Sequence, residues 1–299
     1  MASFFDEISN NRWRSLLLML IFGIFFAFIV FLFIVFLGGG LFGFGIGVAI
    51  ILIYAAISYH MGYKAVLKFS GSKEADPKQY PLLFEVVGGL AAAAEIPTPK
   101  IYIVNDQNPN AFAAGKNRKV STISVTTGLL ATMNRQELEG VIGHEISHIA
   151  NNDVQLMTIA IIFAGIIGII AAFARSFLFF GFGGRGSRNN FGIIMLLGLA
   201  IGFLAPFFAL LIRLAISRRR EYMADANGAR ITRDPGSLAS ALKKIQAYNA
   251  SPNARNVMHA NEVNCSMYFS NPFRKQSLYN IFSTHPPIEE RIKKLETMY

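Results

Sequence analysis

A long stretch without charge is the strongest constraint on how this chain can fold. No Asp, Glu, Lys or Arg occurs at residues 15–63, although the chain of 299 residues is basic overall. A helix needs about 20 mostly apolar residues to cross the hydrocarbon core of a bilayer, so the stretch has room for two crossings. We place them at residues 16–37 and 42–59, separated by three consecutive glycines at 38–40. The sequence therefore predicts an N-terminal membrane segment over residues 1–63.

Two more uncharged runs predict a second transmembrane pair within residues 154–212, at 154–174 and 191–212. The composition agrees, because 15% of the residues are charged, against about 25% in typical soluble domains. The chain has a net charge of +10, and its lysine and arginine residues flank the apolar segments. This arrangement suits binding to lipid headgroups better than binding to nucleic acid. We therefore expect a mainly α-helical membrane protein with four transmembrane helices, whose partner is the lipid bilayer and not nucleic acid.

The remaining sequence, residues 64–153 and 213–299, is polar, and we expect it to form one domain outside the membrane. Apolar residues recur at helical spacing within residues 79–96, and β-branched residues dominate residues 100–106 and 119–128. A small β-sheet packed on helices, an α+β fold, is the expected architecture.

The segment HEISH contains the residues that point most directly to chemistry. It places His144 and His148 four residues apart, with Glu145 beside the first histidine. Residues i and i+4 share one face of a helix, so both imidazoles can bind one ion, and zinc is the typical choice. Asn134 and Glu137 match a capping box and predict where this helix begins. The sequence therefore predicts two metal ligands and an adjacent general base.

A catalytic zinc site has three protein ligands plus water, so a third ligand is required. The segment SRRREYMADANGAR offers Glu221, with Asp225 four residues later to orient a histidine through its other ring nitrogen. If the two spans of residues 154–212 are antiparallel, HEISH and Glu221 lie at about the same distance from the membrane on the same side. The HEISH helix would then continue into the membrane. Two alternatives stay open: the histidine pair is polar helix surface, or Glu221 forms an exposed salt bridge with Arg218 or Arg219.

Four motifs, HEISH, SRRREYMADANGA, NAFA at residues 110–113 and STHPPIEERI at 283–292, resemble the HtpX family of membrane zinc metalloproteases. These gluzincins are relatives of the CAAX prenyl protease. The resemblance implies a zincin-like α+β catalytic domain and one Zn²⁺ per chain. It also implies an integral, multi-pass enzyme of a bacterial-type plasma membrane that degrades misfolded or damaged membrane proteins in stress response and protein quality control. Fewer spans are predicted here than in the CAAX protease, which argues against prenylated substrates.

The same resemblance implies roles for two C-terminal residues. His285 would lie near the active site and stabilise the oxyanion of the tetrahedral intermediate, unless it only caps the last helix. Arg291 would lie nearby as the partner of Asp225 or of another carboxylate. The strand at residues 119–125 would be either the sheet edge to which an extended substrate adds or a plain structural strand.

Lysine and arginine near the ends of spans favour the cytoplasmic side of a membrane. On the side of the proposed zinc site the sequence has Arg12, Arg14, Lys64, Lys68, Arg213, Arg218, Arg219 and Arg220. The loop between the second pair of spans has Arg175, Arg185 and Arg188. We expect the termini and the zinc domain in the cytoplasm. Whether the second pair crosses fully or forms a re-entrant hairpin stays open.

Our first hypothesis is an integral membrane zinc-dependent endopeptidase that cleaves membrane proteins, with Glu145 as the general base for a water activated by zinc. A hypothesis of another class is a non-proteolytic membrane scaffold or chaperone with a structural zinc. A structural site normally has four protein ligands, whereas this sequence offers three good ligands and a spare glutamate, which favours catalysis. A channel or transporter is disfavoured because the predicted spans contain no charged residue.

Overall fold

The fold is that of a computed structural model, which describes residues 40–155, 218–251 and 286–298. Several sequence predictions lie outside these residues: the spans at 16–37 and 191–212, the span at 154–174 beyond residue 155, and His285. By its internal contacts the chain divides into two units. The unit that contains the β-sheet comprises Met61–Ile161 and Ile212–Tyr299, and we call it the sheet unit.

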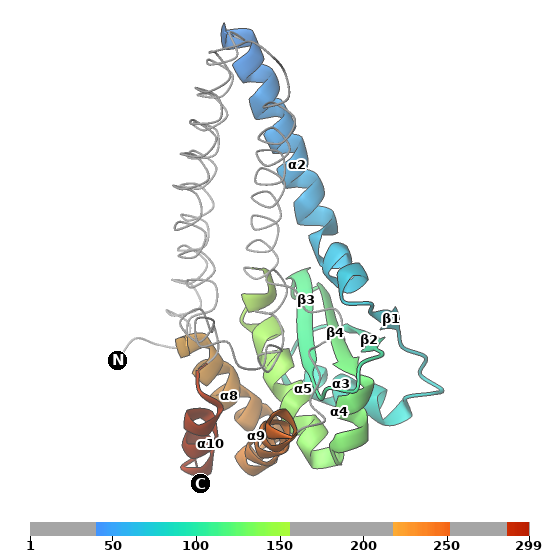
Figure 1. Cartoon of the computed structure of the whole chain (residues 1–299), viewed down its shortest axis with the longest axis vertical. Coiled ribbons are helices and arrows are strands. Elements are labelled where there is room, and N and C mark those ends of the chain that lie inside the picture. The colour runs from blue at the N-terminus through green and yellow to red at the C-terminus, as the bar shows by residue number, and fades with distance from the viewer. Residues whose placement is uncertain (1–39, 156–217, 252–285, 299) are drawn as a thin grey trace, which may run out of the picture. The chain divides into compact units, whose positions relative to one another are not determined.

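Helix α2, Gly40–Phe69, is the blue helix in Figure 1 and begins at the last of the three glycines. It contains residues 42–59, so the helix predicted there is confirmed. Large apolar side chains on it are exposed, among them Phe42 at 83% and Leu52 at 63%. Within the described ranges, no helix is both long and apolar enough to cross a membrane, so the predicted crossing is not confirmed.

The end of α2 is fastened to the sheet by three serines. The Ser70 hydroxyl donates to the Val66 carbonyl at 2.9 Å and lies 2.8 Å from the Ser72 hydroxyl. Ser72 in turn lies 3.2 Å from the Ser124 hydroxyl on the sheet. Gly71 makes the intervening turn with a φ of 68°, a conformation that costs glycine little.

Four strands form one sheet in the order β1-β2-β4-β3. Their bounds are β1 Lys73–Glu74, β2 Lys100–Val104, β3 Ala111–Asn117 and β4 Val120–Thr126. Strands β2 and β4 are parallel, with Ile101 opposite Ile123, and the other two pairs are antiparallel. The predicted α+β architecture with a small sheet is thus present, and β2 and β4 fall where β-branched residues predict strands, whereas β1 and β3 contain no β-branched residue.

The structure overturns one of the two readings of the strand at residues 119–125. This segment is β4, which pairs with β2 on one side and β3 on the other, so it cannot accept a further strand. The reason lies in the β3–β4 turn, where the Asn117 side chain accepts hydrogen bonds from the backbone N–H groups of Lys119 and Val120. This turn folds β3 back onto β4, and β3 becomes an outer strand of the described sheet, at the edge opposite β1.

Further described helices accompany the sheet, some packed on its strands and others on neighbouring helices (Figure 1). They are α3 Pro81–Ala93, α4 Thr127–Thr132, α5 Arg135–Ala150, α8 Arg218–Thr232, α9 Pro235–Ala250 and α10 Ile288–Glu296. Helix α3 confirms the helical spacing of residues 79–96, and buries Leu83, Val86 and Val87. Helix α5 is central, because it contacts α3, β3, α8 and α9. Its residues from Val141 to Ile149 are all buried.

The predicted start of α5 is confirmed. The Asn134 side chain accepts from the Glu137 N–H at 2.9 Å, and the Glu137 carboxylate accepts from the Asn134 N–H at 2.9 Å. The same carboxylate accepts from Ser240 at 2.8 Å and Lys244 at 2.6 Å on α9. One buried glutamate therefore caps α5 and fixes its position on α9.

The end of α5 differs from the prediction that this helix continues into the apolar run. Helix α5 ends at Ala150, and Asn152 has a φ of 60° before a new helical turn begins at Asp153. Val154, predicted as the first residue of a span, is fully buried in the hydrophobic core of the sheet unit. A continuous helix from HEISH into a span is therefore wrong. The physical reason is that a residue in the left-handed conformation cannot continue a right-handed helix.

Candidate metal centre

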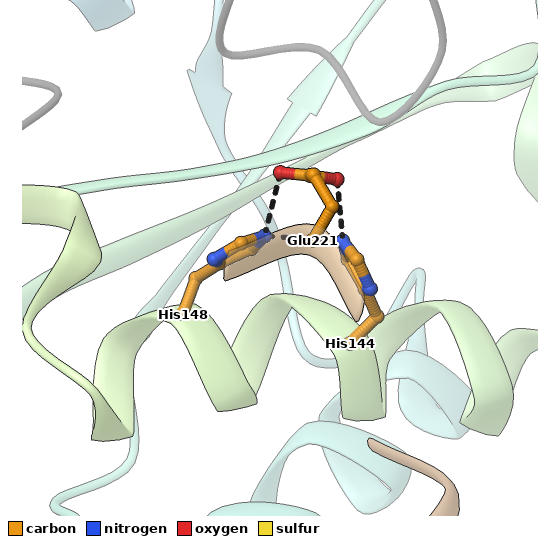
Figure 2. A group of neighbouring side chains, drawn as sticks. All are labelled: His144, His148 and Glu221. Carbon is orange, nitrogen blue, oxygen red and sulfur yellow. Dashed lines mark hydrogen bonds and ion pairs between the residues drawn. The ribbon is translucent and has the colours of Figure 1, made fainter. Parts of the chain in front are cut away.

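Helix α5 directs its two histidines toward one point. His144 and His148 are both buried, and their Nε2 atoms lie 3.1 Å apart. The rings are nearly perpendicular, with an interplanar angle of 87°. Figure 2 shows both rings rising from the same face of the helix, as the spacing of four residues predicts.

Glu221 of α8 completes the group (Figure 2). Its Oε2 lies 3.8 Å from His144 Nε2, and its Oε1 lies 3.6 Å from His148 Nε2. Two ligand atoms that each lie about 2.1 Å from one zinc ion are at most about 4.2 Å apart, so these separations fit a shared ion. Of the described residues, His144, His148 and Glu221 are the ones whose ligand atoms gather in this way. An exposed salt bridge from Glu221 is excluded, because its side chain is buried.

Two glycines allow α8 to approach α5 closely enough for this contact. A Cβ on Gly228 of α8 would lie 2.9 Å from the His144 backbone nitrogen and 3.1 Å from the Gly143 carbonyl carbon. A Cβ on Gly143 would lie 2.9 Å from Thr232 Cγ2. Since real Cβ atoms rarely come this close to other atoms, the helices could not pack at this distance with larger residues. The position of Glu221 therefore depends on glycine at these sites.

A carboxylate and an arginine support His144. Asp225 Oδ1 lies 2.9 Å from His144 Nδ1, the role that the sequence predicts for Asp225. Arg291 of α10 donates to both oxygens of Asp225, from Nε at 2.9 Å and from Nη2 at 2.7 Å. A bidentate pair of this kind fixes orientation as well as charge. Arg291 thus lies where the sequence expects it, as the partner of Asp225.

Sequence reasoning missed a matching arrangement at His148. Asp153 Oδ2 lies 3.0 Å from His148 Nδ1, and Arg220 Nη1 lies 3.7 Å from Asp153 Oδ1. Asp153 is only 2% exposed, so its charge is held inside the sheet unit. The available signal was the pair of asparagines before Asp153, since asparagine is common where a helix ends in the left-handed conformation.

Buried charge around the group favours a divalent cation. Among the described residues, the buried or nearly buried charged side chains there are Glu145, Asp153, Glu221, Asp225, Arg220 and Arg291. With neutral histidines, four carboxylates and two guanidinium groups leave two negative charges in excess. An uncompensated buried charge is costly, and one divalent ion among the three ligand atoms balances this excess. The residues present therefore fit a metal ion of charge two.

The two histidines differ in their pKa values. Burial, assisted by the charge of Arg291, lowers the pKa of His144 to about 4, although Asp225 opposes this shift. Burial also acts to lower the pKa of His148, but the hydrogen bond with Asp153 and the charge of Glu221 prevail and raise that pKa to about 9. His144 is therefore neutral at pH 7, whereas a metal ion at His148 would compete with a proton.

Glu145 is buried on α5 directly after His144. Its negative charge contributes to the raised pKa values of both His148 and Arg291, so the carboxylate acts on the same site. Among the described residues, the predicted ligands, Asp225, Arg291 and Glu145 are thus brought together in the sheet unit.

The fold and the site together define a metallopeptidase: a buried helix carries two histidines and an adjacent glutamate, and a second helix adds a carboxylate. The chain belongs to peptidase family M48, whose family model matches residues 77–299. The resemblance predicted from the sequence motifs is confirmed by this match.

The chain is similar over most of its length to curated HtpX proteins. A Protease HtpX homolog from Caldanaerobacter subterraneus subsp. tengcongensis is 48% identical over 253 residues, which cover 83% of this chain and 82% of that protein. A Protease HtpX homolog from Dictyoglomus turgidum is 42% identical over 297 residues, which cover 99% of this chain and 95% of that protein.

A solved structure supports the fold. The crystal structure of S. mikatae Ste24p resembles this chain with a TM-score of 0.50 and 18% sequence identity. The match covers 97% of this chain and 66% of Ste24p, slightly less than two thirds of that protein. At this identity the likeness concerns the fold alone.

Replacing Gly228 by alanine tests the close contact between α5 and α8. Because the new Cβ would meet backbone atoms of His144 and Gly143, we expect Gly228→Ala to lower the free energy of unfolding by about 1–3 kcal/mol. We also expect weaker binding of added Zn²⁺, since Glu221 would move away from the histidines. Denaturant unfolding and competition with a chromogenic chelator measure the two effects.

Gly88→Ala on α3 is the matched control. A Cβ there meets nothing within 4 Å, so we expect unchanged zinc affinity and a gain of about 0.5–1 kcal/mol from higher helix propensity. Zinc affinity in Gly228→Ala equal to that of the wild type would contradict the role assigned to this glycine.

The Asp225–Arg291 pair predicts a dependence of stability on pH. Burial alone would raise the pKa of Asp225, but the charge of Arg291 and the hydrogen bonds from His144 and Arg291 lower it to about 2. A lowered pKa stabilises the folded state above the unfolded value of about 3.9, and this stabilisation, on the order of 2 kcal/mol, is lost as pH falls toward 2.

We therefore expect the stability difference between the wild type and Asp225→Asn to shrink as pH falls from about 6 to about 2.5. Denaturant unfolding at several pH values measures this difference. A difference that stays constant over that range would show that the ionised form of Asp225 does not stabilise the fold.

Proposed function

We propose that the chain is a zinc-dependent endopeptidase in which His144, His148 and Glu221 are the metal ligands and Glu145 is the general base. The observation that supports it is the group of three ligand atoms, one from each residue and all within 4.8 Å of one another, beside a buried glutamate that is not needed as a ligand. Two imidazoles and one carboxylate are the protein ligands of many catalytic zinc sites.

Different residues of the chain have different roles in the proposed peptide hydrolysis. A zinc ion bound there would supply a Lewis acid that polarises the scissile carbonyl and makes water more acidic. Glu145 takes the proton from the attacking water and then gives it to the leaving amine nitrogen. Asp225 and Arg291 hold the ring of His144 in place during these proton transfers. His285 is the proposed donor to the developing oxyanion.

The alternative of a membrane scaffold or chaperone with a structural zinc is less well supported. Structural zinc sites are usually closed by four protein ligands, whereas the described cluster contains three. Both curated relatives carry protease in their names, and the family match includes the whole of α5 and α8. These observations favour catalysis.

We also propose that the enzyme is embedded in a bacterial-type plasma membrane and faces the cytoplasm. The support comes from the uncharged runs, from the distribution of lysine and arginine, and from the exposed apolar side chains of α2. Misfolded or damaged membrane proteins are the proposed substrates, in line with a role in protein quality control.

Alkaline carbonate extraction of membranes from cells that express the full chain tests the membrane location. The chain should stay in the membrane pellet, because carbonate does not extract proteins embedded in a bilayer. Release of the chain into the supernatant would contradict this proposal.

The Glu145→Gln variant tests the mechanism. Glutamine cannot take a proton from water, so we expect cleavage of a destabilised membrane protein to fall by at least about 100-fold while zinc stays bound. Glu221→Ala should lose zinc, because a ligand is removed, and a chelator should abolish cleavage by the wild type. Metal analysis of the purified full chain and gel-based cleavage assays measure both properties.

Glu139→Gln is the matched control on the same helix, because Glu139 pairs with Arg135 near the surface rather than with the site. It should keep both zinc and activity. Cleavage at the wild-type rate by Glu145→Gln would remove Glu145 from the mechanism, and wild-type zinc content in Glu221→Ala would remove Glu221 from the ligands.

A further inference from the structure

We infer that Asp153, set in place by a left-handed turn at Asn152, is a positioning residue for the ligand His148. The inference rests on the proposed function, because it assumes that His148 binds the metal. It goes beyond that function by assigning a role to the segment after HEISH. The residues involved are Asn152, Asp153 and Arg220, in addition to the ligand itself.

The geometry of a continuous helix would not allow the contact. Asp153 follows His148 by five residues, and on an α-helix that separation turns the side chain about 140° away around the axis. The structure instead breaks the helix at Asn152, whose φ is 60°. The chain turns back, and Asp153 Oδ2 comes to 3.0 Å from His148 Nδ1. The break therefore creates the contact.

The turn is held on both sides. Before it, the Asn151 N–H donates to the Ser147 carbonyl at 2.9 Å and the Asn152 N–H donates to the Ile149 carbonyl at 3.1 Å. After it, Val154 is fully buried in the core. Asparagine adopts the left-handed conformation more readily than other residues with a side chain, whereas β-branched residues avoid it. The identity of residue 152 thus matters for where Asp153 points.

The contact between Asp153 and His148 determines which ring nitrogen of His148 carries the proton and how the ring is oriented. An ionised carboxylate only accepts hydrogen bonds, so Nδ1 of His148 carries the proton and Nε2 keeps its lone pair for the metal. Nε2 is the atom that faces His144 and Glu221. Asp153 therefore selects the form of His148 that can act as a ligand.

Arg220 connects this arrangement to α8. Its Nη1 lies 3.7 Å from Asp153 Oδ1, and Arg220 directly precedes the third ligand, Glu221. The carboxylate that orients His148 thus also contacts the helix that carries Glu221. At His144 the same pattern is built by Asp225 and Arg291. Each histidine is held by an aspartate that is itself paired with an arginine.

The experiment compares zinc affinity among four variants of the purified full chain in detergent, by competition with a chromogenic chelator. Asp153→Ala should weaken Zn²⁺ binding by about 10- to 100-fold, as is usual when a partner of a ligand is removed. Asn152→Val should weaken it by about tenfold, because valine disfavours the left-handed turn. Asn152→Gly should stay within about threefold of the wild type, because glycine accepts that turn.

Asp106→Asn is the control for a general loss of stability. Asp106 is also a buried aspartate, but it accepts hydrogen bonds from Asn108 and is not among the residues around the metal ligands. This variant should bind Zn²⁺ as the wild type does. The visible absorption spectrum of bound Co²⁺ provides a second measurement, and it should change in Asp153→Ala and Asn152→Val but not in Asn152→Gly or Asp106→Asn.

Wild-type zinc affinity and an unchanged Co²⁺ spectrum in Asp153→Ala would overturn the inference. Equal losses in Asn152→Gly and Asn152→Val would overturn the part assigned to the turn, even if Asp153→Ala fails to fold. Failure of the wild type itself to bind Zn²⁺ would instead overturn the proposed function, so the two can be told apart.

Discussion

The close contact between α5 and α8 is the constraint on which the rest of the site depends. The two histidines of the proposed metal centre come from one helix and Glu221 from another, far away in sequence, so the distances between their possible ligand atoms are set by how closely the two helices pack. Gly143 and Gly228 remove the side chains that would keep the helices apart. About one turn earlier on α5, Gly140 plays the same part against α9, where a Cβ would lie 2.7 Å from the Leu238 nitrogen. The geometry of the proposed metal centre therefore depends on small residues that bind no metal.

Electrostatics then determines what can occupy the space that packing creates. Among the described residues, four buried carboxylates face two arginines, and the excess of negative charge is costly in a low-dielectric interior. A divalent ion held by Glu221 and the two histidines would remove this cost. Arg291 donates to Asp225 at 2.7 Å and lies 3.9 Å from Glu221 Oε2, and Arg220 lies 3.7 Å from Asp153 Oδ1. They stabilise the aspartates that orient the rings, and leave the excess charge for the metal.

The sequence predicts well what depends on one helix or on one motif. The start of α5 follows from Asn134 and Glu137, and the shared face of the histidines follows from their spacing. Pairing of Asp225 with Arg291 was expected from motifs rather than from geometry. What depends on long-range packing was not predictable: β4 lies inside the sheet because β3 folds back beside it, which composition does not reveal.

The end of α5 is a second feature that could not be predicted from the sequence. An apolar run after HEISH looks like a continuing helix, because hydrophobicity does not report backbone dihedral angles. The break depends on the φ of Asn152, and with it the position of Asp153. Asparagine pairs before an acidic residue are a weak signal, which only becomes specific once the neighbouring histidine is known to be a ligand.

The most direct test of the central claim is X-ray absorption at the zinc edge on the purified full chain. Two imidazole nitrogens and carboxylate or water oxygens should surround about one zinc per chain, at about 2.0–2.2 Å. A zinc content near zero would contradict the account. So would a sulfur ligand at about 2.3 Å, which would place the metal at Cys265 instead of between α5 and α8.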